Sequence, residues 1–179
     1  MAEPSKEKSL RGAKDGFVEA MMMNIALLRR RIRDNALIFK IYAVGEVTKT
    51  DVALAYMKDR ADQDMVKKMD QTLKQLRLRG LTVTEQTLVE ALTGKKLSWC
   101  NPFPKVRYSQ RPDIIAAHVE EGKLAVIVDN SPTVILLPAG IFDFLQDIDD
   151  YYFPLLTGNY FRFLRILNIF VILFATPVY

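Results

Sequence analysis

Residues 123–137, Lys-Leu-Ala-Val-Ile-Val-Asp-Asn-Ser-Pro-Thr-Val-Ile-Leu-Leu, hold two apolar runs on either side of a polar turn. The runs at 123–128 and 133–137 are short and contain several β-branched residues, which is typical of β-strands. The four residues between them, 129–132, have turn chemistry. Because residues 124–128 are apolar without alternation, we expect a strand that is covered on both faces of a sheet.

Strand and helix patterns alternate through the rest of the chain up to this stretch. Residues 36–44 and 51–57 have strand composition, and they form either a hairpin or the two sides of a longer crossover. Residues 17–33 and 113–121 carry apolar side chains at helical spacing. This alternation predicts an α/β fold, in which a soluble layered domain has a mixed sheet of about four strands and flanking helices.

The helix expected after residue 57 has the most regular pattern in the chain. Asp62 or Asp59 caps its start, and Gly80 ends it. Its apolar stripe consists of Met65, Met69, Leu73 and Leu76. The corresponding stripes are Val18, Met22, Ile25, Leu28 and Ile32 in the helix at 17–33, and Ile115, His118 and Val119 in the helix at 113–121. Shorter helices are predicted at 82–94 and 141–146.

Residues 160–179 are strongly apolar, and no charged side chain follows Arg165. A helix needs about 20 mainly apolar residues to cross a bilayer, so we expect the first part of a membrane-spanning helix here. Arg162 and Arg165 stand before the apolar run, where basic side chains mark the cytoplasmic flank of a span. The alternative is a buried C-terminal helix of a soluble domain, since short apolar runs also form core helices.

These patterns divide the chain into four expected parts. The division is a flexible polar lead-in at 1–16, a soluble α/β subdomain at 17–150, an aromatic connector at 151–159 and a truncated transmembrane helix at 160–179.

Composition limits the chemistry that the chain can perform. Cys100 is the only cysteine and His118 is the only histidine, which argues against a disulfide framework, a zinc site and a histidine-dependent triad. We interpret His118 as a packed histidine rather than a metal ligand. Ser131 does not lie in a nucleophile elbow, and the acidic run at 147–150 lacks the glycine of a calcium loop. We therefore expect no catalytic, cofactor or metal site.

The chain has a net charge of +4, and the excess lies near its beginning, where Arg29, Arg30, Arg31 and Arg33 follow one another closely. We interpret these arginines as the solvated face of a helix, and we expect no nucleic acid partner, because no recognisable DNA-binding motif or stacking platform accompanies them. The alternative is a soluble module that binds phosphate or anionic lipid through these guanidinium groups.

Several groups of residues together resemble the signature of the GerA spore germination family, A-subunit type. The first is Arg-Gly-Ala-Lys-Asp-Gly-Phe-Val-Glu at 11–19, followed by Asn-Ile-Ala-Leu-Leu-Arg-Arg-Arg-Ile at 24–32. Asn-Pro-Phe-Pro at 101–104, Arg-Pro-Asp at 111–113, Val-Asp-Asn-Ser-Pro at 128–132 and Asp-Tyr-Tyr at 150–152 follow in the family's order. The motif residues are Arg11, Gly12, Gly16, Phe17, Glu19, Asn24, Arg29, Arg31, Pro102, Phe103, Pro104, Arg111, Pro112, Asp113, Asp129, Ser131, Pro132 and Tyr151.

The resemblance implies a function that composition alone does not. Members of the family are multi-pass proteins of the spore inner membrane, with a soluble region on the cytoplasmic, core side. Their A subunits assemble into oligomers that form an ion-conducting path. On this basis we expect a non-enzymatic part of such a protein, covering the second soluble subdomain and the start of the first membrane helix. The expected partners are the lipid bilayer, further copies of the same protein and other germination membrane proteins.

Overall fold

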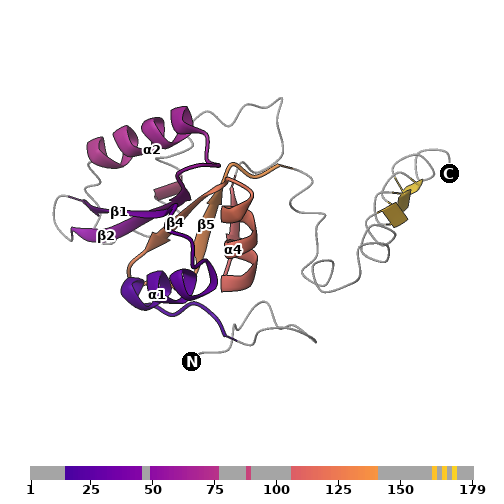
Figure 1. Ribbon diagram of the computed structural model, residues 1–179, viewed down its shortest axis with the longest axis horizontal. Helices are drawn as coiled ribbons and strands as arrows, with labels where there is room; N and C mark the ends of the chain where they lie inside the picture. The colour runs from indigo at the N-terminus through magenta and orange to yellow at the C-terminus, as the bar shows by residue number, and fades with distance from the viewer. Residues whose placement is uncertain are drawn as a thin grey trace.

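The computed structural model describes residues 15–45, 49–76, 88–89 and 106–140, together with the helical pairs 163–164, 167–168 and 171–172. Its elements, shown in Figure 1, are α1 (Met21–Arg31), β1 (Leu37–Val44), β2 (Thr50–Met57), α2 (Gln63–Gln75), β3 (Arg107–Ser109), α4 (Pro112–Glu120), β4 (Leu124–Val128) and β5 (Val134–Leu137).

The five strands form one sheet in the order β1-β2-β4-β5-β3. The strands predicted at 36–44, 51–57, 123–128 and 133–137 are confirmed, and β1 and β2 pair as a hairpin from Leu37↔Met57 to Val44↔Thr50. The expectation of a mixed sheet is wrong, because each pairing among the described strands is antiparallel. The reason is that two of the connections are short turns, which can join only antiparallel neighbours.

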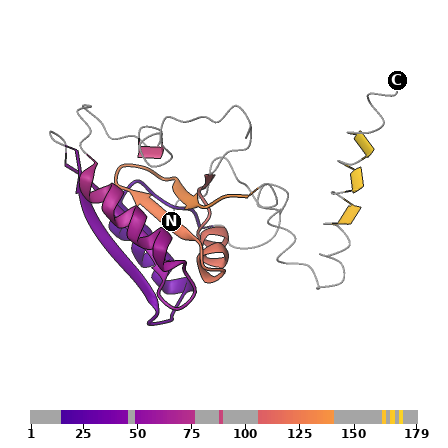
Figure 2. The same cartoon turned by 90° about the horizontal axis from the view of Figure 1, so that it is seen from above.

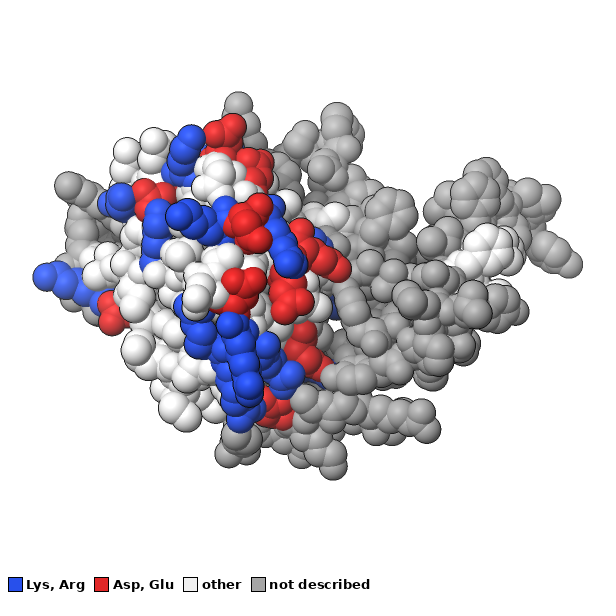
Figure 3. Space-filling view, in the orientation of Figure 1, with Lys and Arg blue, Asp and Glu red and all other residues white. Residues whose placement is uncertain are grey.

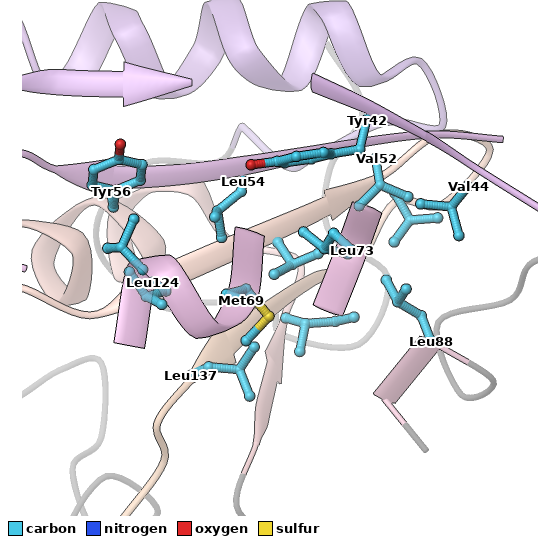
Figure 4. Close-up of a cluster of buried hydrophobic side chains, with 14 of the residues drawn as sticks. Tyr42, Val44, Val52, Leu54, Tyr56, Met69, Leu73, Leu88, Leu124 and Leu137 are labelled. Atoms are coloured by element: carbon cyan, nitrogen blue, oxygen red, sulfur yellow. The ribbon is translucent and has the colours of Figure 1, made fainter. Parts of the chain in front are cut away.

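Helices cover both faces of the sheet, as the α/β prediction requires. Helix α2 lies on one face, and α1 and α4 lie on the other (Figures 1 and 2). Two cores result. The α2-side core includes Leu54, Leu73 and Val126 and is drawn in part in Figure 4, and the α1-side core includes Leu28 and Ile127. The apolar run of β4 is buried along its whole length, as predicted for a strand that is covered on both faces.

Helix α2 forms where the sequence places it. The Asp62 side chain accepts a hydrogen bond from the Asp64 N–H at 3.0 Å, which identifies Asp62 as the N-cap. Met69 and Leu73 are buried, together with Val66, while Met65 is partly buried against the same core. The helix ends at Gln75, and residues 77–80, where the predicted end lies, are outside the described residues.

Helix α1 differs from its prediction in both its start and its inward face. It begins at Met21, and the predicted core residue Met22 is 64% exposed. The buried side chains are Phe17, Met21, Asn24, Leu28 and Ile32. The error arises because a polar residue, Asn24, occupies the centre of the buried face, so that the apolar pattern by itself favours a face rotated by one residue.

Helix α4 begins with Pro112 in its first turn, as predicted, and Gly122 follows its end. Gly122 has a φ of +97°, and its N–H donates to the Val119 carbonyl oxygen at 3.0 Å. A Cβ atom built on this residue would lie 2.6 Å from the Arg60 carbonyl oxygen. Glycine is therefore required here both by the backbone conformation and by the neighbouring chain.

The predicted transmembrane helix at 160–179 remains a prediction. Within the parts of the chain that the structure describes, no helix is long and apolar enough to cross a membrane. The helical pairs of this region expose apolar side chains, including Phe163, Val171 and Ile172. The predicted helix at 141–146 and the connector at 151–159 lie outside the described residues. In the predicted helix at 82–94 only the pair 88–89 is described, and Leu88 is buried in the α2-side core.

Candidate functional site

Motif residues from three distant parts of the chain meet beside the start of α1. We call this region the motif junction; it comprises residues 15–24, 109–113 and 129–133. The Phe17 N–H donates to the Gln110 carbonyl oxygen, and the Asn130 N–H donates to the Glu19 carbonyl oxygen, each at 2.9 Å. The segment before α1 is therefore held between the start of α4 and the turn that follows β4.

Asn24 supports this segment from inside the domain. Its side chain is fully buried, with Oδ1 accepting from the Val18 N–H at 2.8 Å and Nδ2 donating to the Val18 carbonyl oxygen at 2.6 Å. An amide that is buried without hydrogen-bond partners destabilises the fold. Both polar atoms of Asn24 have partners, which are the backbone groups of one residue, Val18. Asn24 therefore fixes the bend between the extended segment and the helix.

Asp129 provides α1 with a cap from a distant part of the chain. Its Oδ1 accepts a hydrogen bond from the Met21 N–H at 3.0 Å, while Ala20, the residue before the helix, provides no side-chain cap. A carboxylate at a helix N-terminus satisfies a free N–H and interacts favourably with the helix dipole. The contact also joins the end of β4 to the start of α1, since Asp129 and Met21 are 108 residues apart along the chain.

We predict that Asp129→Ala lowers the free energy of unfolding by about 1 kcal/mol, the usual value of an N-cap. Asp129→Asn is the matched control, since its amide oxygen still accepts the same hydrogen bond. Urea unfolding of both variants measures the difference. Equal losses in the two variants would contradict the capping role.

Arg111 and Asp113 form a buried ion pair at the start of α4. Arg111 is 1% exposed, and it donates from Nε to Oδ1 of Asp113 at 3.0 Å and from Nη2 to Oδ2 at 2.5 Å. The Arg111 N–H donates to Ser109 Oγ at 3.1 Å. Asp113 Oδ1 also accepts from the Ile114 N–H at 3.0 Å. The two parallel hydrogen bonds of this pair therefore hold the backbone between β3 and α4 in one conformation.

Ser131 and Asp129 of the junction both bond to the backbone of neighbouring segments. Ser131 Oγ lies 3.3 Å from the Thr133 carbonyl oxygen and accepts from the Thr133 N–H at 3.0 Å, which closes the turn between β4 and β5. Asp129 bonds to the backbone of α1. Among the residues that the structure describes, no group of three or more His, Cys, Asp or Glu side chains is placed to hold a metal ion.

The four arginines lie at and just beyond the end of α1, where Figure 3 shows a group of basic side chains. Arg29 donates to the carbonyl oxygens of Asp34 (2.9 Å) and Leu37 (2.8 Å), and its guanidinium lies 5.2 Å from the centre of the Phe39 ring. These contacts attach the helix end to β1. Arg29 is nevertheless exposed, as predicted for a solvated helix face.

Two further arginines of this group share one carboxylate. Arg30 Nη2 lies 2.9 Å from Asp15 Oδ2, and Arg31 pairs with Asp15 Oδ1. Arg33 Nε lies 3.4 Å from the Arg30 carbonyl oxygen. Arg30 and Arg33 are exposed, whereas Arg31 is partly buried. The group therefore keeps its positive charge at the surface while several of its N–H donors are used inside the domain.

His118 is fully buried on the inner side of α4, as predicted for a packed histidine. Arg107 Nη1 lies 3.3 Å from its Nε2, and Glu121 Oε2 lies 3.0 Å from its Nδ1. Lys123 Nζ also lies 3.1 Å from Nδ1. Both ring nitrogens therefore face a donor, and only Nδ1 also faces an acceptor, the Glu121 carboxylate, so we assign the proton to Nδ1 and the acceptor role to Nε2. Burial lowers the pKa of His118, and the positive charges of Lys123 and Arg107 act in the same direction, while Glu121 opposes them.

We predict that stability falls as the pH drops from about 7 to about 5, because an unfolded histidine has a pKa of about 6.5 and takes up a proton that native His118 resists. The contribution is fully present above the unfolded pKa and declines as the pH falls below it. His118→Gln should flatten this part of the pH profile, measured by urea unfolding at a series of pH values. A variant profile with the wild-type slope would refute the assignment.

One polar cluster of the domain was not predicted from the sequence. Asp70 on α2 pairs with Lys74 at 2.7 Å and accepts a hydrogen bond from the Tyr42 hydroxyl. The bonds from Lys74 and Tyr42, with the nearby charge of Lys40, lower the pKa of Asp70 to about 2, whereas burial raises the pKa of Tyr42. The four-residue spacing of Asp70 and Lys74 is the signal that would have indicated this pair.

The remaining motif and flank residues are of two kinds, those outside the described residues and those within the junction. Arg11, Gly12, Pro102, Phe103, Pro104, Tyr151, Arg162 and Arg165 lie outside the described residues, as do Cys100 and the acidic run at 147–150. Gly16 is buried, Pro112 is buried and Pro132 is partly buried.

Comparison with known proteins gives the same family over the whole chain. The family described as Bacillus/Clostridium GerA spore germination protein matches residues 1–179. Stage V sporulation protein AF of Bacillus subtilis (strain 168) is 41% identical over 177 residues, which cover 99% of this chain and 35% of that protein. This is also the subtype that the sequence motifs favour. The membrane protein YfkQ of the same organism is 34% identical and covers 99% of this chain and 34% of its own length.

A solved structure supports the fold directly. The N-terminal domain of the A subunit of the Bacillus megaterium spore germinant receptor GerK3 is similar with a TM-score of 0.55 and 32% sequence identity. The match covers 71% of this chain and 98% of that domain. The chain spans about a third of the length of the curated relatives that it matches, for example 35% of stage V sporulation protein AF.

Proposed function

Because the chain belongs to the GerA family of spore germination proteins, we propose that it is a non-enzymatic part of a germination membrane protein whose α/β domain helps to assemble or gate an oligomeric ion channel. The observation that carries the proposal is the family match, which extends over residues 1–179. The site of action is the spore inner membrane, with the α/β domain on the cytoplasmic, core side.

The chemistry of the motif junction supports a non-enzymatic role. A catalytic site needs a nucleophile or base whose reactive atoms face a substrate. Asp129 and Ser131 instead bond to the backbone of α1 and of the turn before β5, and Arg111 is enclosed with Asp113. The motif residues therefore set the relative positions of α1, α4 and the sheet, which is the role expected of an assembly domain.

Two observations support a membrane location. One relative with 34% identity is named as a membrane protein. In addition, residues 160–179 are apolar after Arg165, and the described side chains of this region, such as Phe163, Leu167 and Ile172, are exposed. Exposed apolar residues in a row are unfavourable in water and favourable in lipid. Arg162 and Arg165 on the preceding side favour a cytoplasmic position of the domain.

The alternative is a soluble module that binds phosphate or anionic lipid, and its phosphate-binding form is less well supported. Binding a phosphate through paired donors needs free N–H groups. Arg29 uses two of its donors on the carbonyl oxygens of Asp34 and Leu37, and Arg30 and Arg31 both bind Asp15. These contacts therefore use some of the donors of Arg29, Arg30 and Arg31 within the domain, which leaves fewer of them for a phosphate group.

The proposal is tested by expressing the full chain with an epitope tag in a sporulating Bacillus host and fractionating its spores. We expect the chain in the membrane fraction after washing with high salt, and release into the soluble fraction when residues 160–179 are deleted. Chemical cross-linking in these membranes should give a ladder of homo-oligomers. A full-length chain that washes off in salt, or that remains monomeric after cross-linking, would contradict the membrane and the assembly parts of the proposal respectively.

A further inference from the structure

The outward face of α1 combines exposed methionines at one end with exposed arginines at the other. Met22 and Met23 are 64% and 59% exposed, which is unusual for large apolar side chains of a helix that packs on a domain. Ala26 is also exposed, and it is followed on the same side by Arg29, Arg30 and Arg33. Residues three and four apart share one side of a helix, so Met22, Met23, Ala26, Arg29 and Arg30 form a continuous strip along α1. The exposed Arg33 follows just beyond the helix end, and we call these six residues the α1 outer strip.

The strip carries charge of one sign only. No Asp or Glu occurs between residues 20 and 33. The nearest carboxylates along the chain in either direction are Glu19 and Asp34 at its two ends, and Asp15, which pairs with Arg30 and Arg31. The exposed side of α2, on the opposite face of the sheet, differs in this respect, because Asp64 pairs with Lys67 there and Lys74 pairs with the partly buried Asp70. The exposed sides of α1 and α2 therefore differ in the kind of surface that they can meet.

We propose that the α1 outer strip docks on the surface of a bilayer that contains anionic lipid. The arginines complement the negative charge of the head groups, and their long stems allow the charged ends to remain at the phosphate level. Met22 and Met23 are flexible and apolar, and they enter the boundary between head groups and acyl chains. A guanidinium that donates to Asp15 or to a carbonyl group keeps its charge, so long-range attraction to a membrane does not need the free donors that a phosphate site needs.

This inference rests on the proposed membrane location and adds an orientation to it. A domain that is attached to a bilayer through residues 160–179 can present either face of its sheet to the lipid. Docking through α1 places α1 and α4 toward the membrane and α2 toward the aqueous side. The α2 side, with its paired charges, then remains available for contact with water or with other proteins.

The test places an environment-sensitive fluorophore on each face of the full chain. In a Cys100→Ser background, a single cysteine is introduced by Met23→Cys in the α1 outer strip or by Lys67→Cys on α2, as the matched control. Lys67 has a side chain that is 74% exposed. Each labelled chain is mixed with vesicles of phosphatidylcholine alone or with added phosphatidylglycerol, and sedimentation of the chain with the vesicles is measured separately from the fluorescence.

We expect a blue shift from the label at position 23 only with the anionic vesicles, loss of that shift at high salt, and no shift at position 67. Adding Arg33→Gln should lower the affinity for the anionic vesicles by about fivefold, which is the contribution of one basic residue near an anionic surface. Among the described residues, the contact of Arg33 is a long one, with the Arg30 carbonyl oxygen, so this variant should fold normally. Met22→Ser tests the apolar end in the same way.

Each result has a distinct meaning. Sedimentation with the vesicles without a shift at position 23 would overturn docking through α1 while leaving the membrane location intact. Equal shifts at positions 23 and 67 would also overturn it, because they indicate contact without a preferred face. A chain that sediments with neither kind of vesicle would contradict the membrane location and the docking together. A shift at position 23 that is caused by added protein but not by lipid would assign the strip to a protein partner and refute the proposal.

Discussion

Arg111→Ala should lower the free energy of unfolding by about 3–5 kcal/mol, because removing one partner of a buried ion pair leaves the other charge without compensation. Arg111 is almost fully buried, and its guanidinium makes two parallel hydrogen bonds with Asp113, which itself is only 14% exposed on its side chain. A domain of this size has a total stability of about 5–15 kcal/mol. The substitution therefore removes a large part of what holds the domain together.

A double-mutant cycle separates the pair from the other contacts of each residue. Arg111→Met and Asp113→Asn are measured singly and together by urea unfolding. Because the cost of each single change comes mainly from the charge that is left behind, the double variant should be less destabilised than the sum of the two. If the two effects add to within about 0.5 kcal/mol, the two side chains are not coupled and the prediction is wrong.

Gly122→Ala should lower the free energy of unfolding by about 3 kcal/mol, through left-handed backbone strain and a steric clash of comparable size. The φ of +97° disfavours any residue with a Cβ atom, and that atom would lie 2.6 Å from the Arg60 carbonyl oxygen. The clash is with main-chain atoms, so a side-chain rotation cannot relieve it. The Arg60 segment would have to move away from the end of α4, where Arg60 Nη1 donates to the Glu120 carbonyl oxygen at 2.9 Å.

Gly45→Ala is the matched control for this effect. Gly45 also has a positive φ, of +105°, but it lies at the far end of the β1-β2 hairpin from Arg60. Its substitution should show a conformational cost of about 1 kcal/mol without a clash against Arg60. Thermal unfolding of both variants gives the comparison. Equal losses at the two glycines would show that the approach of Arg60 contributes nothing.

The elements that the sequence predicted correctly are those in which local pattern and burial agree. The strands around 123–137 are apolar and fully buried, and α2 has both a regular stripe and a capping aspartate, Asp62. The face of α1 was misplaced because Asn24 is buried through hydrogen bonds to Val18, which no hydrophobic pattern records. β3 was missed because it has three residues and is stabilised by pairing with β5, from Arg107↔Leu136 to Ser109↔Val134.

The candidate site was predictable only in part, for a related reason. The motif residues could be identified from their residue types and their order in the chain, but their roles depend on contacts between distant segments. Asp129 caps α1 across 108 residues, and Phe17 bonds to the backbone of Gln110. Spacing along the chain contains no information about such pairs. Spacing does indicate pairs that are close together in the chain, such as Arg111 with Asp113 and Asp70 with Lys74.

The separation of the two cores by the sheet has a consequence for how this domain can evolve. Leu73 lies in the α2-side core and Leu28 in the α1-side core, and the strands lie between them. Substitutions at such separated positions act independently, so the changes that they cause in the free energy of unfolding add. One side of the domain can therefore accumulate substitutions while the packing on the opposite side of the sheet stays intact.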